Sequence, residues 1–360
     1  MQSHKNAAKK LSARTTLISE AELAWPSGDR PGDLKFNHEL PSSVSNAINL
    51  ALHSTYLLNQ VGGGQLHALC PPKGVIGRYK LSTREGKWFI RVSSRWGQPE
   101  IEKAITDYLI KQGVKINPLL VSGEKVYWNG QVFRLDVRPM IEGRHFNGST
   151  EDIAEVAATL RACHSALLNF PEADRVTQTT SARYRHLAKI RDLIAETLEG
   201  QKNDLFVERA TWADSHRDWL SDMVAHFDPS FDQYLGAQCI HGEIHPANVL
   251  YSREGSAILI DFEESVHVFA PPVWDFAFLV QRFCLHDNPA ASVVRQRLSV
   301  ITEAYGRPLP NLAMMMRQIA WFSMAIIVDL RISQSVVTPL SEYDKFVRLE
   351  RQARIFENFL

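Results

Sequence analysis

Two polar clusters, each preceded by a short apolar run, lie between residues 238 and 264, and they constrain the fold more than any other feature. The first cluster contains Glu243 and Asn248, and the second begins with Asp261. A strand pattern at 249–251 and a turn pattern after it separate the two clusters. We therefore expect a hairpin that brings the three side chains together.

The side chains of this expected hairpin offer carboxylate and carboxamide oxygens. Hard divalent cations such as Mg²⁺ prefer oxygen ligands and usually share them with substrate phosphates. Catalysis of phosphoryl transfer consists mostly of positioning and charge neutralisation. The two clusters therefore indicate a Mg²⁺-assisted phosphoryl transfer.

The run H-G-E-I-H-P-A-N-V-L, followed by I-L-I-D-F-E, resembles the catalytic core of the aminoglycoside phosphotransferase and choline kinase-like superfamily. The pattern of that family is H-G-D-x-x-x-x-N and then I-D-[FW]-[DE]. The resemblance implies that Asn248 and Asp261 bind Mg²⁺, and that the catalytic residue that orients or deprotonates the acceptor hydroxyl is Glu243. The family has Asp at this last position, so Glu243 keeps the carboxylate on a side chain one methylene longer.

Other interpretations of the same stretch are weaker. His-x-Glu also opens the zinc deaminase signature, but no Pro-Cys-x-x-Cys follows it in this chain. His241 and His245 have the spacing of a helical metal pair, but Gly242 and Pro246 argue against a helix there. A polar hairpin with buried histidines is the remaining alternative.

The resemblance implies an α+β, bilobal, protein kinase-like fold, with a small antiparallel-sheet lobe and a larger, mainly helical lobe. We assign residues 42–140 to the nucleotide-binding lobe, and residues 141–360 to the lobe with the catalytic hairpin and the acceptor site. Residues 1–41 are polar and contain three prolines, so we expect an extension that is extended or partly disordered.

In kinase-like folds a glycine loop joins the first two strands, and a cation on the third strand holds the phosphates. Gly74 and Gly77 precede two alternating strand patterns, and Arg91 occupies the cation position of the second pattern. An exposed strand arginine is the alternative for Arg91. The resemblance places Glu102 as the helix glutamate that pairs with the strand cation; Glu100 competes for that role, and a solvated helix face is the alternative for both.

The sequence also predicts roles for four further side chains of the second lobe. By resemblance, L-R-A-C-H-S-A-L makes His164 a structural histidine, and P-P-V-W-D-F-A makes Asp275 a structural brace. Glu263 and Glu264 either attract a cationic acceptor, such as an aminoglycoside or amino alcohol, or are solvated, or bridge to the other lobe.

Composition limits the partners of the chain. The 40 basic and 40 acidic residues balance, so we expect no broad binding to nucleic acid or to an anionic membrane. The four cysteines are scattered, and no secretory signal pattern is present, which favours the cytoplasm. The most apolar stretch, 319–328, is too short to span a bilayer and is expected to form a buried helix.

The combined expectation is an ATP-dependent, Mg²⁺-requiring phosphotransferase that acts on a hydroxyl of a small molecule. The alternative is a nucleotide-binding pseudokinase with a regulatory or scaffolding role. Glu243 and the arginine at position 91 favour the alternative, whereas the intact Asn248 and Asp261 oppose it.

Overall fold

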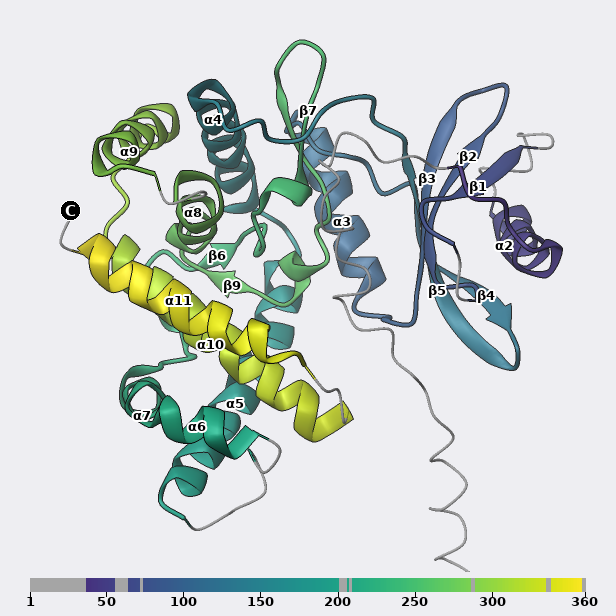
Figure 1. The fold of residues 1–360 in the computed structure, drawn as a ribbon. Helices are drawn as coiled ribbons and strands as arrows, with labels where there is room; N and C mark the ends of the chain where they lie inside the picture. Colours follow the sequence, from purple (N-terminus) through teal and green to yellow (C-terminus); the bar gives the residue numbers. More distant parts are fainter. Residues whose placement is uncertain are drawn as a thin grey trace, which may run out of the picture.

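A computed structural model describes most of the chain, namely residues 37–55, 64–71, 74–200, 206, 209–285, 289–334 and 338–357. Figure 1 shows a sheet on one side of the molecule and a larger group of helices on the other. This arrangement confirms the expected α+β division into a sheet lobe and a helical lobe. Most of the extension 1–41 lies outside the described residues, although His38 forms an isolated antiparallel bridge with Ala68.

The sheet is fully antiparallel, with the strand order β1-β2-β3-β5-β4. Its strands are β1 (Gln65–Ala68), β2 (Gly77–Ser82), β3 (Lys87–Ser93), β4 (Val121–Trp128) and β5 (Gln131–Pro139). Alternate residues of a strand point to opposite faces. On β3, Ile90 and Val92 are therefore buried in the sheet core, which α2 (Ser42–Ser54) completes with Val44 and Ile48, while Arg91 faces the other way.

The turn between β4 and β5 follows the sequence closely. Asn129 and Gly130 have φ angles of 48° and 75°, which is the left-handed pair that a two-residue hairpin turn requires. Asparagine and glycine adopt these angles at the lowest cost, so these two residues fit the turn that joins β4 and β5.

Helix α3 (Pro99–Lys111) fastens the sheet lobe to the helical lobe. Its buried residues Ile101, Ile105 and Leu109 belong to the large core of the helical lobe and not to the sheet core. The chain after α3 then pairs with the second lobe, since the backbone N–H of Asn117 donates to the carbonyl of Leu259 at 3.0 Å. Both contacts restrict how the two lobes lie relative to each other.

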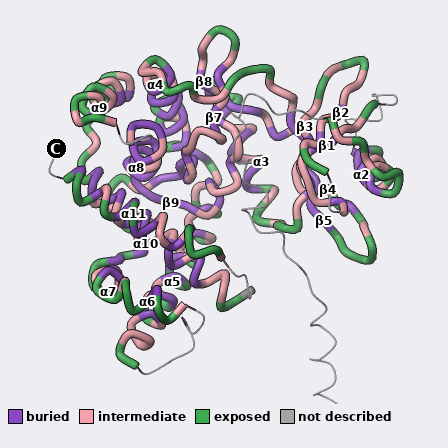
Figure 2. The backbone as a smooth tube through the Cα atoms, in the orientation of Figure 1, coloured by how far each residue is buried: buried purple, intermediate pink, exposed green. Residues whose placement is uncertain are grey.

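The helical lobe surrounds two short hairpin-like strand pairs. Figure 2 shows its buried stretches concentrated around α4 and α8, with α9 largely at the surface. The elements are α4 (Thr150–Leu167), α5 (Ala173–Leu198), α6 (Ala210–Ser215), α7 (Arg217–His226), β6 (Gln238–Cys239), β7 (Val249–Tyr251), β8 (Ala257–Leu259), β9 (Phe269–Ala270), α8 (Val273–Leu279), α9 (Ala291–Tyr305), α10 (Leu312–Gln334) and α11 (Leu340–Glu357).

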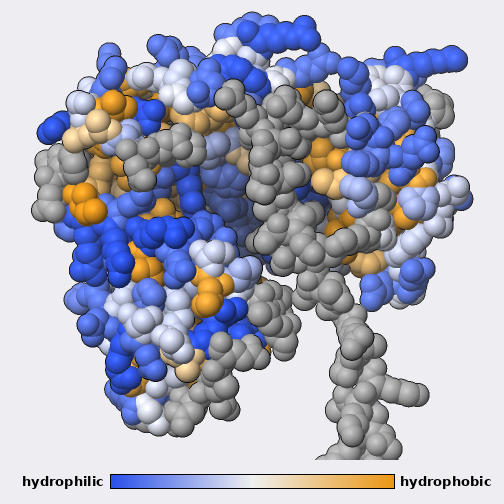
Figure 3. All heavy atoms as spheres, viewed as in Figure 1, coloured by the Kyte–Doolittle hydropathy of each residue, from blue (hydrophilic) through white to orange (hydrophobic). Residues whose placement is uncertain are grey.

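Helix α10 is the predicted buried helix. Within the described part of the chain it alone has the length and composition to cross a membrane, over Leu312–Ser333, yet 72% of that window is buried inside the protein. Its Trp321 and Met324 lie in the core of the helical lobe. On the face drawn in Figure 3, hydrophilic residues predominate and apolar residues occur in small separate groups.

Candidate active site

The loop between β6 and β7 carries the first polar cluster, and side chains of α8 form hydrogen bonds with its backbone. The Asp275 carboxylate accepts hydrogen bonds from the backbone N–H groups of His241 and Gly242, at 2.9 and 2.8 Å. The ring of His164 lies 2.9 Å from the same carboxylate, and the indole N–H of Trp274 donates to the Gly242 carbonyl at 2.9 Å. The predicted structural roles of His164 and Asp275 are confirmed.

The predicted hairpin that joins the two clusters is also confirmed. Strands β7 and β8 pair antiparallel, and the carbonyl of Ile260, just beyond β8, accepts a hydrogen bond from the His241 ring at 3.0 Å. Asp261 follows with a φ of 62°, in the left-handed region that residues other than glycine rarely adopt. Such backbone costs about 1–3 kcal/mol and occurs mainly at functional sites. The surrounding structure must therefore hold Asp261 in this conformation.

Asn248 and Glu243 lie in the same loop and touch each other. The Asn248 amide nitrogen donates to the Glu243 carbonyl at 3.0 Å, which fixes the amide and leaves its oxygen for a metal ion. The side chain of Asn248 is buried, and that of Glu243 is half-buried. The loop geometry thus presents one carboxylate and one amide oxygen close to the start of β7.

The donor set fits a magnesium ion that is shared with a nucleotide. Asn248 and Asp261 supply two hard oxygen ligands, and Mg²⁺ is usually bound by one or two such side chains together with phosphates and water. Among the described residues, no group of three or more His, Cys, Asp or Glu side chains has the geometry of a metal site.

Arg91 reaches from the sheet lobe into this hairpin. Its guanidinium lies 3.2 Å from the Asp261 carboxylate and 2.7 Å from that of Glu263. Burial opposes the charge on Arg91, but the carboxylates of Asp261 and Glu263 outweigh burial and raise its pKa. Burial likewise opposes the charge on Asp261, but Arg91 and its neighbouring arginines outweigh burial and lower the pKa of Asp261. Arg91 is therefore an interlobe cation beside the expected metal site, and not an exposed strand residue.

The predicted pairing of Glu102 with Arg91 is wrong. The two oxygens of Glu102 each lie 2.6 Å from a guanidinium, one of Arg134 and one of Arg138. Arg134 and Arg138 of β5 point toward α3 and neutralise the buried Glu102. Arg91 lies on another strand and pairs with the hairpin instead. Glu100 does not take the role either, because its side chain is 89% exposed and lies 3.8 Å from an arginine of α5.

Gly74 lies between β1 and β2, and Gly77 is the first residue of β2, so the two glycines stand where the sequence predicts a glycine loop. Gly74 has a φ of 83°, which favours glycine. A Cβ atom on Gly77 would lie 3.0 Å from the hydroxyl of Tyr79, which donates to the Val75 carbonyl at 2.7 Å. Each glycine therefore has a local structural reason to be there, whatever it contacts when a ligand is bound.

Arg78 is a site residue that the sequence pattern does not single out. It lies directly opposite Arg91 in the register of β2 and β3, so the two side chains share the face of the sheet that looks toward the hairpin. Burial and the nearby charge of Arg91 lower the pKa of Arg78, and Arg78 in turn helps to lower the pKa of Asp261. The strand register, which a single sequence does not reveal, creates this pair of arginines.

Glu263 and Glu264 each have an arginine partner. Glu263 bridges to Arg91 in the sheet lobe, and Glu264 lies 2.7 Å from Arg183 of α5. Burial and the adjacent Asp261 raise the pKa of Glu263. Of the three alternatives from the sequence, bridging therefore describes Glu263, and neither carboxylate is left to attract a cationic acceptor.

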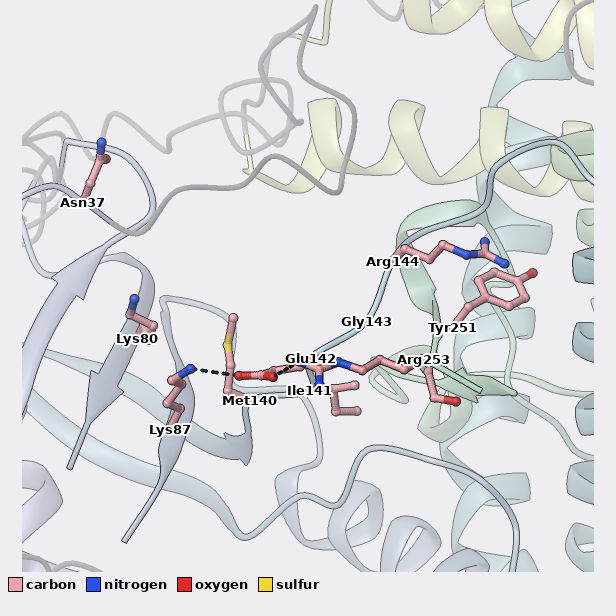
Figure 4. Close-up of a pocket in the computed structure, with 11 residues that line it drawn as sticks. Asn37, Lys80, Lys87, Met140, Ile141, Glu142, Gly143, Arg144, Tyr251 and Arg253 are labelled. Atoms are coloured by element: carbon pink, nitrogen blue, oxygen red, sulfur yellow. Dashed lines mark hydrogen bonds and ion pairs between the residues drawn. The ribbon is translucent and has the colours of Figure 1, made fainter. Parts of the chain in front are cut away.

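A pocket of about 780 Å³ opens where the two lobes are joined. Figure 4 shows Lys80 and Lys87 on the sheet side, Tyr251 and Arg253 on the hairpin side, and the connecting chain between them. Glu142 of that chain pairs with Lys87 and with Arg253, at 2.8 Å in each case. The expected metal ligands do not line this pocket, whose wall includes the connecting chain 140–144.

Comparison with known proteins supports the assignment. The model of the phosphotransferase enzyme family matches residues 71–309, more than half of the chain. No curated protein matches the chain. Among solved structures, an ethanolamine kinase from Plasmodium vivax is 13% identical, with 94% of this chain and 100% of that chain covered and a TM-score of 0.56.

Two further structures have the same fold. The choline kinase LicA from Streptococcus pneumoniae is 12% identical, with 85% of this chain and 99% of that chain covered and a TM-score of 0.53. An AMP-bound spectinomycin phosphotransferase is 16% identical, with coverages of 83% and 94% and a TM-score of 0.54. These likenesses show the kinase-like fold, and the family match goes further: the chain belongs to the phosphotransferase enzyme family.

Proposed function

We propose that the protein is an ATP-dependent phosphotransferase that requires Mg²⁺ and acts on a hydroxyl group of a small molecule. One observation carries this proposal: Arg91 of the sheet lobe meets Asp261 of the catalytic hairpin, whose loop also presents Asn248 and Glu243. A cation, two oxygen ligands for a metal and a candidate base thus lie together where the sheet lobe meets the hairpin. Phosphoryl transfer needs these parts and little else.

In this proposal, the nucleotide binds between the lobes 42–140 and 141–360. Gly74 and Gly77 shape the loop over the phosphates, and Arg91, with Arg78 beside it, contacts phosphate oxygens. Glu102 contributes indirectly, because it fixes Arg134 and Arg138 behind the site. Mg²⁺, held by Asn248 and Asp261, would neutralise charge on the phosphates.

Glu243 is proposed to act on the acceptor. Its carboxylate accepts the proton of the hydroxyl group as the hydroxyl oxygen bonds to the γ-phosphorus. The bond between that phosphorus and the bridging oxygen breaks, so a phosphate ester and ADP are the products. The spectinomycin and choline kinases of the same fold support a small-molecule acceptor. We propose a cytoplasmic protein, with neither nucleic acid nor membrane as a partner.

The alternative proposal is a nucleotide-binding protein without turnover, with a regulatory role. The ion pairs of Arg91 with Asp261 and Glu263 favour it, because they occupy the groups that phosphate and metal would use. The longer side chain of Glu243, at the position where the family has Asp, also favours this alternative.

Two measurements on the full chain separate these proposals. Thermal unfolding with ATP, in the presence and absence of Mg²⁺, reports nucleotide binding, and both proposals predict a higher Tm with ATP. ADP release against a panel of hydroxylated metabolites and antibiotics then reports transfer. A phosphotransferase releases ADP with at least one acceptor and incorporates phosphate into it. Binding without any acceptor-dependent ADP release supports the regulatory protein, and an unchanged Tm contradicts both.

A further inference from the structure

The chain just after Asp261 is anchored to helix α5. Its short 3₁₀ turn, Glu264–Val266, packs against both α3 and α5. The Glu264 carboxylate lies 2.7 Å from the guanidinium of Arg183, which belongs to α5. The same nitrogen of Arg183 donates to the carbonyl of His267 at 3.3 Å, directly after the turn. One arginine therefore holds both ends of the turn.

The turn also lies directly against the catalytic loop. A Cβ atom on Gly242 would lie 3.2 Å from the carbonyl carbon and from the Cβ atom of Glu264, which is tighter than ordinary van der Waals contact. The Ser265 hydroxyl donates to the carbonyl of His241 at 2.9 Å. Gly242 immediately precedes the proposed base, Glu243. A displacement of the turn would therefore displace the backbone that carries the base.

Arg183 has a second connection to the catalytic loop, through aromatic side chains. Its guanidinium carbon lies 5.1 Å from the centroid of the Phe322 ring of α10, and an arginine at this distance is attracted to the ring. Phe322 packs edge-on against Trp274, with ring centroids 5.0 Å apart. The Trp274 indole N–H donates to the Gly242 carbonyl. The place of Arg183 relative to the loop is thus determined from two directions.

The ion pair between Arg183 and Glu264 is largely shielded from water, since the two side chains are 22% and 28% exposed. Burial disfavours the charge on Glu264, but the positive charges around it, Arg183 foremost, outweigh burial and lower the pKa of Glu264. The carboxylate is therefore charged at neutral pH. A hydrogen bond between two charged groups is roughly twice as strong as one between neutral groups.

We propose that Arg183 is a positioning residue of the phosphotransferase reaction. Through Glu264 it holds the turn against Gly242, and so it fixes the place of the base Glu243 relative to the metal site. The inference rests on the proposed function and adds to it a residue that acts through another side chain. The metal ligand Asp261 keeps its own contact with the sheet lobe, so loss of Arg183 should slow the transfer step and leave ATP binding unchanged.

The first test measures the loop itself and needs no substrate. Backbone amide exchange of the full chain is followed by mass spectrometry in the native protein, Arg183→Gln and Glu264→Gln. In both variants the peptide 239–245 should exchange about tenfold faster or more, the factor expected for one charge-assisted hydrogen bond. Peptides of the sheet lobe should exchange as in the native protein. Arg185→Gln is the matched control, because it removes an exposed arginine of the same helix. Native-like exchange at 239–245 in Arg183→Gln would overturn the inference.

The second test measures turnover, as ADP release with the acceptor that the panel of hydroxylated compounds identifies. Arg183→Gln and Glu264→Gln should each lower kcat about tenfold or more, since a misplacement of 1 Å can cost about a hundredfold, and the KM for ATP should not change. The double variant should be no slower than either single variant, because each single change removes the same interaction. Arg183→Lys should recover part of the rate.

A purely structural role of Arg183 gives a different result. The Tm of Arg183→Gln would then fall while kcat, measured well below that Tm, stays native, or the losses of the two single variants would add in the double variant. Either outcome contradicts the inference. If the native protein binds no ATP or transfers phosphate to no acceptor, the phosphotransferase proposal fails instead, and amide exchange at 239–245 still decides whether Arg183 holds the loop.

Discussion

Replacement of Asp275 tests whether α8 really holds the catalytic loop. The carboxylate is fully buried and accepts from two backbone N–H groups and lies against the ring of His164. Asp275→Ala leaves the N–H groups of His241 and Gly242 buried without an acceptor. Each such group costs about 1–3 kcal/mol, so the free energy of unfolding should fall by about 2–6 kcal/mol. That is a large share of the roughly 5–15 kcal/mol by which a protein is stable.

The assay is urea denaturation followed by tryptophan fluorescence. Asp275→Asn should lower the free energy of unfolding less than Asp275→Ala does. The amide oxygen can still accept a hydrogen bond from one backbone N–H, whereas the amide nitrogen cannot accept one from the other. Asp192→Asn is the matched control, since its carboxylate is 61% exposed and the change should stay within about 0.5 kcal/mol. If the free energy of unfolding of Asp275→Ala lies within about 1 kcal/mol of the native value, roughly the contribution of one neutral hydrogen bond, the loop does not depend on this brace.

The remaining predictions concern Arg91, Glu243 and His241. Arg91→Ala should raise the KM for ATP, and Arg91→Lys should partly restore it; an unaltered ATP dependence would make Arg91 a purely structural bridge. Glu243→Gln should lose nearly all phosphoryl transfer and keep ATP binding, and Glu243→Asp should lose activity as well, by up to about a hundredfold for a shift near 1 Å. A much faster Glu243→Asp would mean that the native site is impaired. Burial lowers the pKa of His241, so the unfolded chain binds the proton more readily, and stability should fall as the pH drops below about 6.5. His241→Gln should weaken that pH dependence, and an identical slope in both proteins would count against a buried neutral His241.

The sequence predicts the catalytic hairpin because its parts are local. Asn248, β7, β8 and Asp261 follow one another within fifteen residues, and turn residues such as Gly255, with a φ of 84°, determine how the chain returns. The brace at Asp275 is likewise recognised from a short motif. For such features, the spacing along the chain nearly determines the spacing in the molecule.

Contacts between distant segments are not determined in this way. The partner of Glu102 depends on which arginines β5 directs toward α3, and the partner of Arg91 is 170 residues away in sequence. The juxtaposition of Arg78 with Arg91 depends on strand register. Helix α9 lies largely at the surface, and its buried residues are Val294, Ile301 and Tyr305.

The most direct measurement of the central claim is calorimetric titration of ATP into the native protein and into Asp261→Ala, each with and without Mg²⁺. We expect Mg²⁺ to strengthen ATP binding to the native protein, and we expect this dependence on Mg²⁺ to disappear in Asp261→Ala while the far-UV circular dichroism is unchanged. Equal Mg²⁺-dependent affinity in the two proteins would contradict the account, because Asp261 would then have no part in holding the metal and the nucleotide.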